Sequence, residues 1–291
     1  MASPSCSIAA VRGRFPLLAA LMALAWSSPG VAGARRVDVG GFKLNLRCVG
    51  EGSPVVLLDS GAGDTSETWD WVVPGVRRFT RVCVYDRAGL GRSDPGPFPR
   101  TSDRIADELA LLLERAHVPG PYVLAGHSFG GLNLRLYASR HPRDVAGLVL
   151  VDATPEDFPA RESALRSRDE NEKLRTARSL GPVAFQSEVD AMPESVAAVR
   201  VAKATEAPVI VITAIHADAN LPFRSLWADL QTKMLKTFPH ARQIIAEGSG
   251  HYIQYDQPEL VIDAIRELTL AARVSDERPK EPSRDRRGSS D

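Results

Sequence analysis

The chain has 291 residues, 44% of them hydrophobic and 25% charged, which is an ordinary balance for one large or two small globular domains. Lysine and arginine together number 36, as do aspartate and glutamate, so the formal net charge is zero. A neutral chain has no global field that would attract nucleic acid or an anionic membrane surface, so we expect a small-molecule substrate and no nucleic-acid partner.

The first 34 residues have the order of a secretory signal peptide. Arg12 and Arg14 precede the apolar stretch of residues 15–26, and a small-x-small cleavage pattern follows at residues 32–34. The apolar stretch is about a dozen residues long, which is too short to span a bilayer comfortably. We therefore expect cleavage of residues 1–34, export to the periplasm or the medium, and no stable membrane anchor.

The cysteines are compatible with export. Cys6 lies in the predicted signal peptide, which leaves Cys48 and Cys83 in the mature chain. An even pair in an exported protein permits a disulfide, although two buried free thiols fit the sequence about equally well. No cysteine–histidine cluster has metal-ligand spacing, so the sequence predicts no metal site.

Strand and helix patterns alternate along the body of the chain, residues 35–274. Residues 37–39 and 42–49 alternate apolar and polar side chains around Gly40-Gly41, which predicts an antiparallel hairpin. Further strands are predicted at residues 55–58, 81–85, 122–125, 145–151, 209–213 and 243–246, and helices at residues 101–117, at residues 132–140 and from Pro258 onwards. This order predicts an α/β fold with a mostly parallel sheet and helices on both faces.

One segment interrupts the alternation. Residues 154–205 contain no strand pattern and instead carry charged helical segments at residues 161–180 and 188–203. Inserted between two strands, this segment is expected to form a helical cap over the carboxyl ends of the strands, where open α/β sheets bind ligands. The last segment, residues 275–291, is rich in charge, proline and serine and is expected to be a disordered tail.

The stretch Gly126-His127-Ser128-Phe129-Gly130 fits the pattern G-x-S-x-G, with a predicted strand before it and a predicted helix after it. Glycines two residues before and after the serine leave room for a sharp turn that lifts Ser128 above the sheet. The following helix offers free N–H groups and a partial positive charge. Ser128 is therefore predicted to be a nucleophile, whereas His127 points away from it toward the packing or the substrate side.

With this motif in its context, the sequence resembles the α/β-hydrolase family, and the resemblance covers residues 37–273. Ser60-Gly61-Ala62-Gly63 follows the third predicted strand, where the family keeps its oxyanion loop, although many members have a histidine in place of Ser60. Residues 86–93 resemble the family's loop after the fourth strand, to which we assign a structural role. The resemblance implies that the backbone N–H groups of Ala62 and Phe129 form the oxyanion hole.

The same resemblance bears on the cysteines. The family places the second and fourth strands side by side, so Cys48 and Cys83 are expected to be near enough for a cross-strand disulfide.

A serine nucleophile needs a general base. His251 is the candidate, because Ser249-Gly250-His251 follows the last predicted strand, where the family places its catalytic histidine. His117, His141 and His240 lie near helix ends or in loops, and we expect them at the surface.

The triad also needs a carboxylate that orients the histidine. Asp218 follows the strand of residues 209–213, where most family members carry the acid, but its loop is one residue longer than usual and lacks the usual glycine. Asp152 ends the strand of residues 145–151, an acid position that some family members use, and is placed rigidly there. We prefer Asp152, and both remain candidates.

These features predict an exported serine hydrolase that cleaves a carboxylic ester, a lactone or a thioester through an acyl-enzyme on Ser128, with His251 as general base and no cofactor. One alternative is an amidase, a peptidase or a carbon–carbon bond hydrolase with the same residues. Another is a non-catalytic binding module, because a fold does not imply a function. Trp69 and Trp71 are expected in the core, or else in the acyl pocket.

Overall fold

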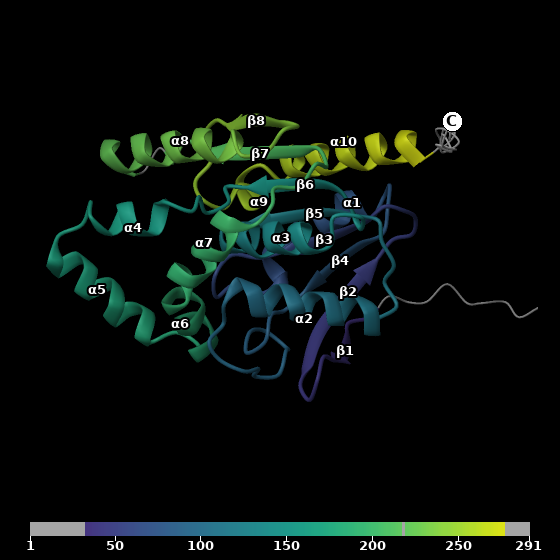
Figure 1. The fold of residues 1–291 in the computed structure, drawn as a ribbon, viewed down its shortest axis with the longest axis horizontal. Helices are drawn as coiled ribbons and strands as arrows, with labels where there is room; N and C mark the ends of the chain where they lie inside the picture. The colour runs from purple at the N-terminus through teal and green to yellow at the C-terminus, as the bar shows by residue number, and fades with distance from the viewer. Residues whose placement is uncertain (1–32, 217–218, 277–291) are drawn as a thin grey trace, which may run out of the picture. The chain divides into compact units, whose positions relative to one another are not determined.

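The computed structural model describes residues 33–216 and 219–276 (Figure 1). Residues 1–32, most of the predicted signal peptide, and residues 277–291, most of the predicted tail, lie outside the described residues. Within the described part, no helix combines the length and the apolar character that a membrane crossing requires.

The core of the described chain is an eight-stranded sheet in the order β1-β2-β4-β3-β5-β6-β7-β8 (Figure 1). The strands are β1 (Arg35–Asp38), β2 (Lys43–Val49), β3 (Val55–Asp59), β4 (Val82–Tyr85), β5 (Tyr122–His127), β6 (Val145–Val151), β7 (Val209–Ala214) and β8 (Ala241–Ala246). The β1–β2 and β2–β4 pairs are antiparallel, and all the others are parallel. The predicted α/β fold with a mostly parallel sheet is confirmed.

Helices cover both faces of this sheet because its central strands are apolar on both sides. Every residue of β3, β4 and β5 is buried. One face carries α2 (Ser102–Arg115), α3 (Phe129–Arg140) and the end of α8 (Leu221–Leu235). The other face carries the 3-10 helix η1 (Ser66–Trp69), α1 (Val73–Val76), α9 (Ile253–Asp256) and α10 (Pro258–Asp276). Such two-sided burial is typical of parallel sheets.

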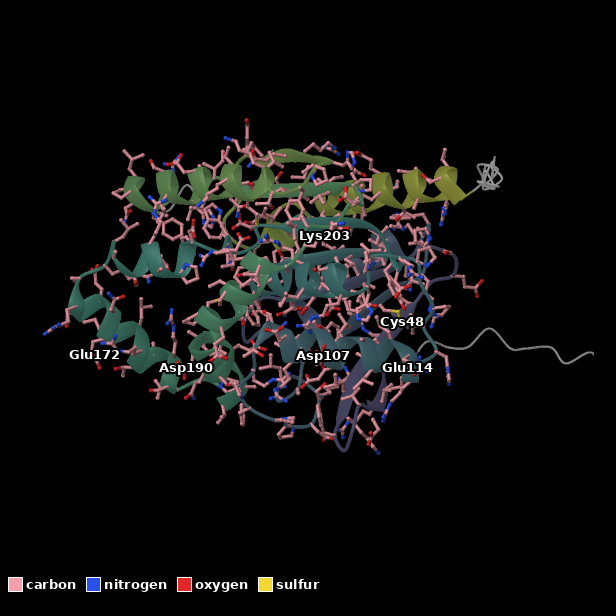
Figure 2. All side chains as sticks on the ribbon, in the orientation of Figure 1. Cys48, Asp107, Glu114, Glu172, Asp190 and Lys203 are labelled. Atoms are coloured by element: carbon pink, nitrogen blue, oxygen red, sulfur yellow. A yellow bond between two sulfur atoms is a disulfide. The ribbon has the colours of Figure 1, made fainter. Side chains whose placement is uncertain are left out.

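The β2–β4 pair carries the disulfide. Cys48 and Cys83 are direct partners in the antiparallel register, with their Cα atoms 4.1 Å apart, and their sulfur atoms are bonded. The bond is visible beside Cys48 in Figure 2. Of the two possibilities that the sequence left open, a cross-strand disulfide and two free thiols, the structure has the disulfide.

The insertion of residues 154–205 lies between β6 and β7 and consists of four helices joined by turns and loops (Figure 1). It comprises α4 (Phe158–Ser163), α5 (Arg168–Ser179), α6 (Val183–Asp190) and α7 (Met192–Val201). The sequence predicted two longer helices. The second is interrupted because Pro193 lacks the N–H that would continue α6, and it lies in the first turn of α7 instead.

Two further details differ from the sequence expectations. Trp69 lies in the core, as expected, but Trp71 is 69% exposed and lies outside the core. The helix α8, begun by an Asn220 cap whose side chain accepts from the N–H of Phe223, was not predicted.

Candidate active site

Ser128 occupies the sharp turn between β5 and α3. Its backbone has φ 51° and ψ −118°, a conformation that costs a non-glycine residue roughly 1–3 kcal/mol. The surroundings hold it there. The N–H of Ser128 donates to the carbonyl of Val151 at 3.2 Å, and its carbonyl accepts from the N–H groups of Gly131 and Thr154, both at 3.1 Å. The strained turn projects the side chain from the carboxyl end of the sheet.

The two glycines of the motif are needed for close backbone approach. A Cβ on Gly126 would lie 2.7 Å from the carbonyl oxygen of Gly130, and a Cβ on Gly130 would collide with the carbonyl of Asp59. A side chain at Gly126 would therefore push the start of α3 away from β5, and one at Gly130 would push the turn away from β3.

The structure brings Ser128, His251 and Asp152 into one hydrogen-bonded row. The Oγ of Ser128 lies 3.0 Å from Nε2 of His251, and Nδ1 of the same ring lies 2.7 Å from Oδ2 of Asp152. The three residues follow β5, β8 and β6 respectively, so the carboxyl ends of three parallel strands supply them. The order serine, acid, histidine along the chain is the one that the resemblance implied.

Asp152 is fully buried and its carboxylate is saturated with donors. Besides His251, the N–H of Ala214 donates to it at 3.0 Å, Nε1 of Trp227 at 2.8 Å and Nε2 of His216 at 2.8 Å. Burial alone would raise the pKa of Asp152, but the hydrogen bonds from His216 and His251 outweigh it and hold that pKa below its usual value. The group is therefore a carboxylate at neutral pH. Asp218, the alternative acid, lies outside the described residues.

His216 is the site residue that sequence reasoning missed. It follows β7 with φ 53°, and its ring packs against Phe223 and Trp227 at centroid distances of 5.4 and 5.2 Å. The available signal was its position after β7, in the loop where most relatives place the acid.

Asp152, His216 and His251 are also the group within the described residues whose donor atoms are close enough to hold a metal ion. Their nitrogen–oxygen distances of 2.7 and 2.8 Å are hydrogen-bond distances. Ligand atoms on a tetrahedral zinc ion, each about 2.0–2.1 Å from it, would lie ~3.3 Å from one another. The geometry thus matches two imidazoles hydrogen-bonded to one carboxylate.

The loop after β3 lies against the turn that carries Ser128. A Cβ on Gly61 would lie 3.0 Å from Nδ1 of His127, so the loop touches the residue next to the serine. Within the described residues, the N–H groups of Ala62 and Phe129 have no hydrogen-bond acceptor. Phe129 begins α3, where N–H groups have no partner inside the helix. Both predicted oxyanion donors thus lack an acceptor among the described residues.

The side chain of His127 contacts the backbone of His251, the predicted general base. It is fully buried, and its Nε2 lies 2.9 Å from the carbonyl oxygen of His251, to which it donates as a neutral imidazole. Burial, followed by the charge of His251, lowers the pKa of His127 to about 3. Its Nδ1 faces Asp64 Oδ2 at 3.9 Å, and neither atom has a hydrogen-bond partner among the described residues. This contact agrees with the predicted packing role.

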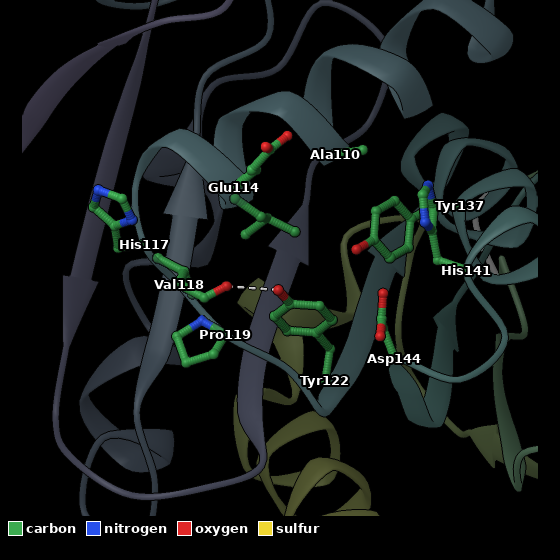
Figure 3. A pocket seen from close by; sticks show the side chains of 10 residues that line it. Ala110, Glu114, His117, Val118, Pro119, Tyr122, Tyr137, His141 and Asp144 are labelled. Atoms are coloured by element: carbon green, nitrogen blue, oxygen red, sulfur yellow. Dashed lines mark hydrogen bonds between the residues drawn. The ribbon is translucent and has the colours of Figure 1, made fainter.

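The remaining histidines, and a separate pocket, lie away from the row of Ser128, His251 and Asp152. A pocket of about 570 Å³ lies beside Tyr122, with His117 and His141 among its lining residues. Figure 3 shows these side chains. Tyr122 begins β5 and Ser128 follows its end, roughly 20 Å away along the strand. His117 and His240 are exposed, as expected, while His141 is half-buried against the ring of Tyr137.

Comparisons with known proteins identify similar sequences and similar structures. A sequence model of the alpha/beta hydrolase family matches residues 55–264. The uncharacterized protein YqjL of Bacillus subtilis is 25% identical over 223 residues, which is 77% of this chain and 86% of that protein.

Among solved structures, a thermophilic esterase from Thermogutta terrifontis is 24% identical with a TM-score of 0.58, and the match covers 83% of this chain and 99% of the esterase. A meta-cleavage product hydrolase from Pseudomonas fluorescens is 20% identical with a TM-score of 0.60, covering 83% and 98%. These two structures share the fold.

Proposed function

Because the chain belongs to the alpha/beta hydrolase family, whose sequence model covers residues 55–264, we propose that it is a serine hydrolase that cleaves a carboxylic ester. The observation that carries the proposal is the hydrogen-bonded row Ser128–His251–Asp152, with distances of 3.0 and 2.7 Å. Family members are generally hydrolytic enzymes, and such a row activates a serine for attack on a carbonyl carbon.

The proposed reaction has two halves. His251 takes the proton of Ser128 as its oxygen attacks the carbonyl, and the N–H groups of Ala62 and Phe129 hold the negative oxygen of the tetrahedral intermediate. His251 then protonates the departing alcohol, which leaves an ester between the acyl group and Ser128. Water, deprotonated by the same histidine, cleaves that ester and restores the hydroxyl.

An ester is the preferred substrate class for a chemical reason. The acyl-enzyme is itself an ester, so a site that completes the second half is competent to cleave one. An amide additionally requires full protonation of its amine before it leaves, and a carbon–carbon bond requires a stabilised carbanion. Thioesters and lactones present the same carbonyl to Ser128 and belong to the same proposal.

The cap is proposed to select the substrate. A recess of about 330 Å³ lies between α4, α5 and α8; Leu165, Leu174 and Phe223 are the apolar part of a lining that is otherwise charged or polar. Phe223 packs against His216, which donates to Asp152, so this lining adjoins the acid side of the row.

A panel of activated substrates tests the proposal. The mature protein is expected to hydrolyse p-nitrophenyl esters of some chain length, to leave aminoacyl p-nitroanilides largely intact, and to react with a fluorophosphonate probe. Ser128→Ala should lower kcat by roughly 10⁶-fold and abolish labelling. Equal turnover in that variant would contradict the mechanism. A wild-type protein that neither turns over any ester nor reacts with the probe would favour a binding module.

Export is the second part of the proposal. The disulfide Cys48–Cys83 supports it, because such bonds persist in oxidising compartments outside the cytosol. Mass spectrometry of the protein recovered outside the cytosol is expected to find an N-terminus at Arg35. An intact N-terminus confined to the cytosol would contradict export.

A further inference from the structure

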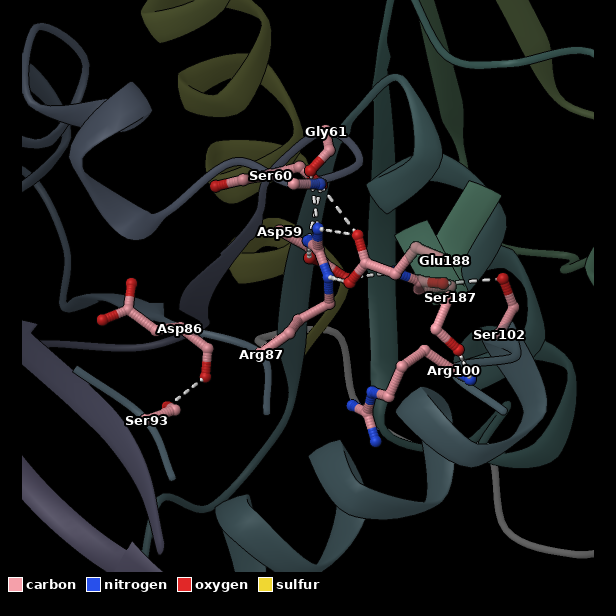
Figure 4. Close-up of polar contacts among 12 residues, drawn as sticks. Asp59, Ser60, Gly61, Asp86, Arg87, Ser93, Arg100, Ser102, Ser187 and Glu188 are labelled. Carbon is pink, nitrogen blue, oxygen red and sulfur yellow. Dashed lines mark hydrogen bonds and ion pairs between the residues drawn. The ribbon is translucent and has the colours of Figure 1, made fainter. Parts of the chain in front are cut away.

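Arg87, which follows β4, lies beneath the loop of Ser60–Gly63 with only 1% of its side chain exposed (Figure 4). Its Nη1 donates to Asp59 Oδ1 and its Nε to Glu188 Oε1, each at 2.7 Å. Burial opposes the charge, but the carboxylates of Glu188 and Asp59 hold the pKa of Arg87 above its ordinary value. The guanidinium is thus a permanent, fully paired cation inside the protein.

The same guanidinium also holds the backbone of the loop. Nη1 donates to the carbonyl of Ser60 at 2.7 Å, and Nη2 donates to the carbonyl of Gly61 at 2.6 Å (Figure 4). In a trans peptide the C=O and the N–H point in opposite directions. Because Arg87 holds the carbonyl of Gly61, the N–H of Ala62 in the same peptide unit must point away from Arg87.

Glu188 holds the next peptide unit. Its Oε2 accepts from the N–H of Gly63 at 2.8 Å while it also accepts from Nη2 of Arg87 at 3.0 Å. One ion pair therefore fixes the peptide units on both sides of the Cα of Ala62. We propose that Glu188 is a positioning residue that, through Arg87, sets the direction of the Ala62 oxyanion donor. This inference rests on the proposed serine hydrolase function.

The loop needs such a restraint because glycines flank Ala62. Gly63 has φ 76°, and glycine crosses between backbone conformations with little steric cost. If the Gly61–Ala62 peptide turned over, its carbonyl oxygen would take the place of the N–H donor. A negative partial charge would then face the developing oxyanion, which would remove the stabilisation that the hole provides.

The restraint comes from the cap. Glu188 belongs to α6 and lies 125 positions after Gly63 in the chain. Phe185, one turn earlier on the same helix, also covers the loop, because a Cβ on Gly63 would lie 2.6 Å from its ring. Arg87 alone holds the carbonyls of Ser60 and Gly61, and α6, when seated on the loop, completes the restraint through Glu188. The cap thereby contributes to the chemical step in addition to covering the substrate.

Glu188→Gln tests the inference, with Glu108→Gln as the matched control. Glu108 pairs with buried Arg100 through two hydrogen bonds of 2.6 Å, and within the described residues its carboxylate makes no contact with the loop. Both variants replace one carboxylate of a buried arginine pair by an amide. The quantities to measure are kcat, KM, Tm and the inhibition constant of an alkyl boronic acid, which forms a tetrahedral adduct with the serine.

Glu188→Gln is expected to lower kcat about 10²-fold and to weaken boronate inhibition similarly, with KM within about threefold of wild type. Glu108→Gln is expected to keep kcat and boronate inhibition within about threefold of wild type, even if its Tm falls as much as that of Glu188→Gln. Glu188→Asp, which retains the charge but shortens the reach to Gly63, should lose about tenfold in kcat and serves if the first variant does not fold.

Equal losses of kcat in the glutamine variants at positions 188 and 108, or a change in KM alone at position 188, would overturn the inference. In that case wild-type turnover and fluorophosphonate labelling would leave the proposed function standing. A wild-type protein with no esterase activity and no labelling would instead remove the proposed function, and the inference with it.

Discussion

His216 and His251 share one oxygen of Asp152: Oδ2 lies 2.8 Å from Nε2 of the first ring and 2.7 Å from Nδ1 of the second. The ring centroids of the two histidines lie 5.7 Å apart. His251 is the ring that also reaches Ser128, whereas the hydrogen bond of His216 is to the carboxylate. The arrangement makes the acid better fixed, and its negative charge better stabilised, than an acid with a single histidine partner.

Asp152→Asn should lower kcat about 10⁴-fold with little change in KM, because an amide leaves His251 in the wrong tautomer. Steady-state kinetics on an activated ester provide the measurement. Asp218→Asn is the matched comparison and is expected to retain kcat within a few-fold. The opposite ranking of the two variants would assign the acid to Asp218.

His216→Phe should destabilise the protein, because the buried carboxylate of Asp152 loses a donor and its pKa rises. Hydrogen bonds to charged groups contribute roughly 1.5–3 kcal/mol, so a loss of that order in the free energy of unfolding is expected at pH 7. Since the pKa of Asp152 is depressed in the folded state, its contribution is present above the unfolded value of 3.8 and is lost as the pH falls further.

Urea titrations at pH 7 and at pH 3 measure this effect. The difference between wild type and His216→Phe should shrink at the lower pH, and His216→Gln, which keeps a donor, should recover part of it. A difference independent of pH would mean that packing against Phe223 and Trp227 is the main role of the ring.

His127 is expected to make the protein acid-sensitive. Its pKa is about 3 in the folded state against 6.5 in the unfolded chain, so the unfolded chain binds more protons between these values. The stability contribution is complete above pH 6.5 and falls by up to about 1.4 kcal/mol for each pH unit below it.

His127→Asn retains a donor for the carbonyl of His251 but does not titrate, so the slope of unfolding free energy against pH between 6.5 and 4 should be shallower than in wild type. His240→Asn, at an exposed position, is the control and should follow the wild-type slope. If His127→Asn follows that slope too, the acid sensitivity belongs to other groups.

Removing the disulfide should weaken the fold without impairing the site. Cys48 and Cys83 are 35 positions apart, and a cross-link over such a loop stabilises by ~3–4 kcal/mol in the chain-entropy account. The double alanine variant is expected to lose that amount in chemical denaturation while keeping kcat at 25 °C within a few-fold. Alkylation of the denatured, unreduced wild type should label neither cysteine, and two labelled thiols would contradict the bond.

Local sequence patterns were sufficient to predict much of the fold and part of the candidate site. The order of strands and helices, the turn at Ser128 and the position of His251 depend on residues close together in the sequence. Apolar runs, flanking glycines and a strand end carry that information directly. The errors in the elements were local as well: Pro193 splits a predicted helix, and Trp71 faces outward although its neighbour Trp69 does not.

The tertiary structure decided what depends on contacts between distant segments. His216 and His251 meet on Asp152 because the parallel register brings the ends of β6, β7 and β8 to the same edge of the sheet. The pairing of Glu188 with Arg87 spans 101 positions and requires the cap to fold back onto the loop after β3. A sequence pattern records which side chains follow which strand, but strand order and cap position determine which of them can share a proton or a charge.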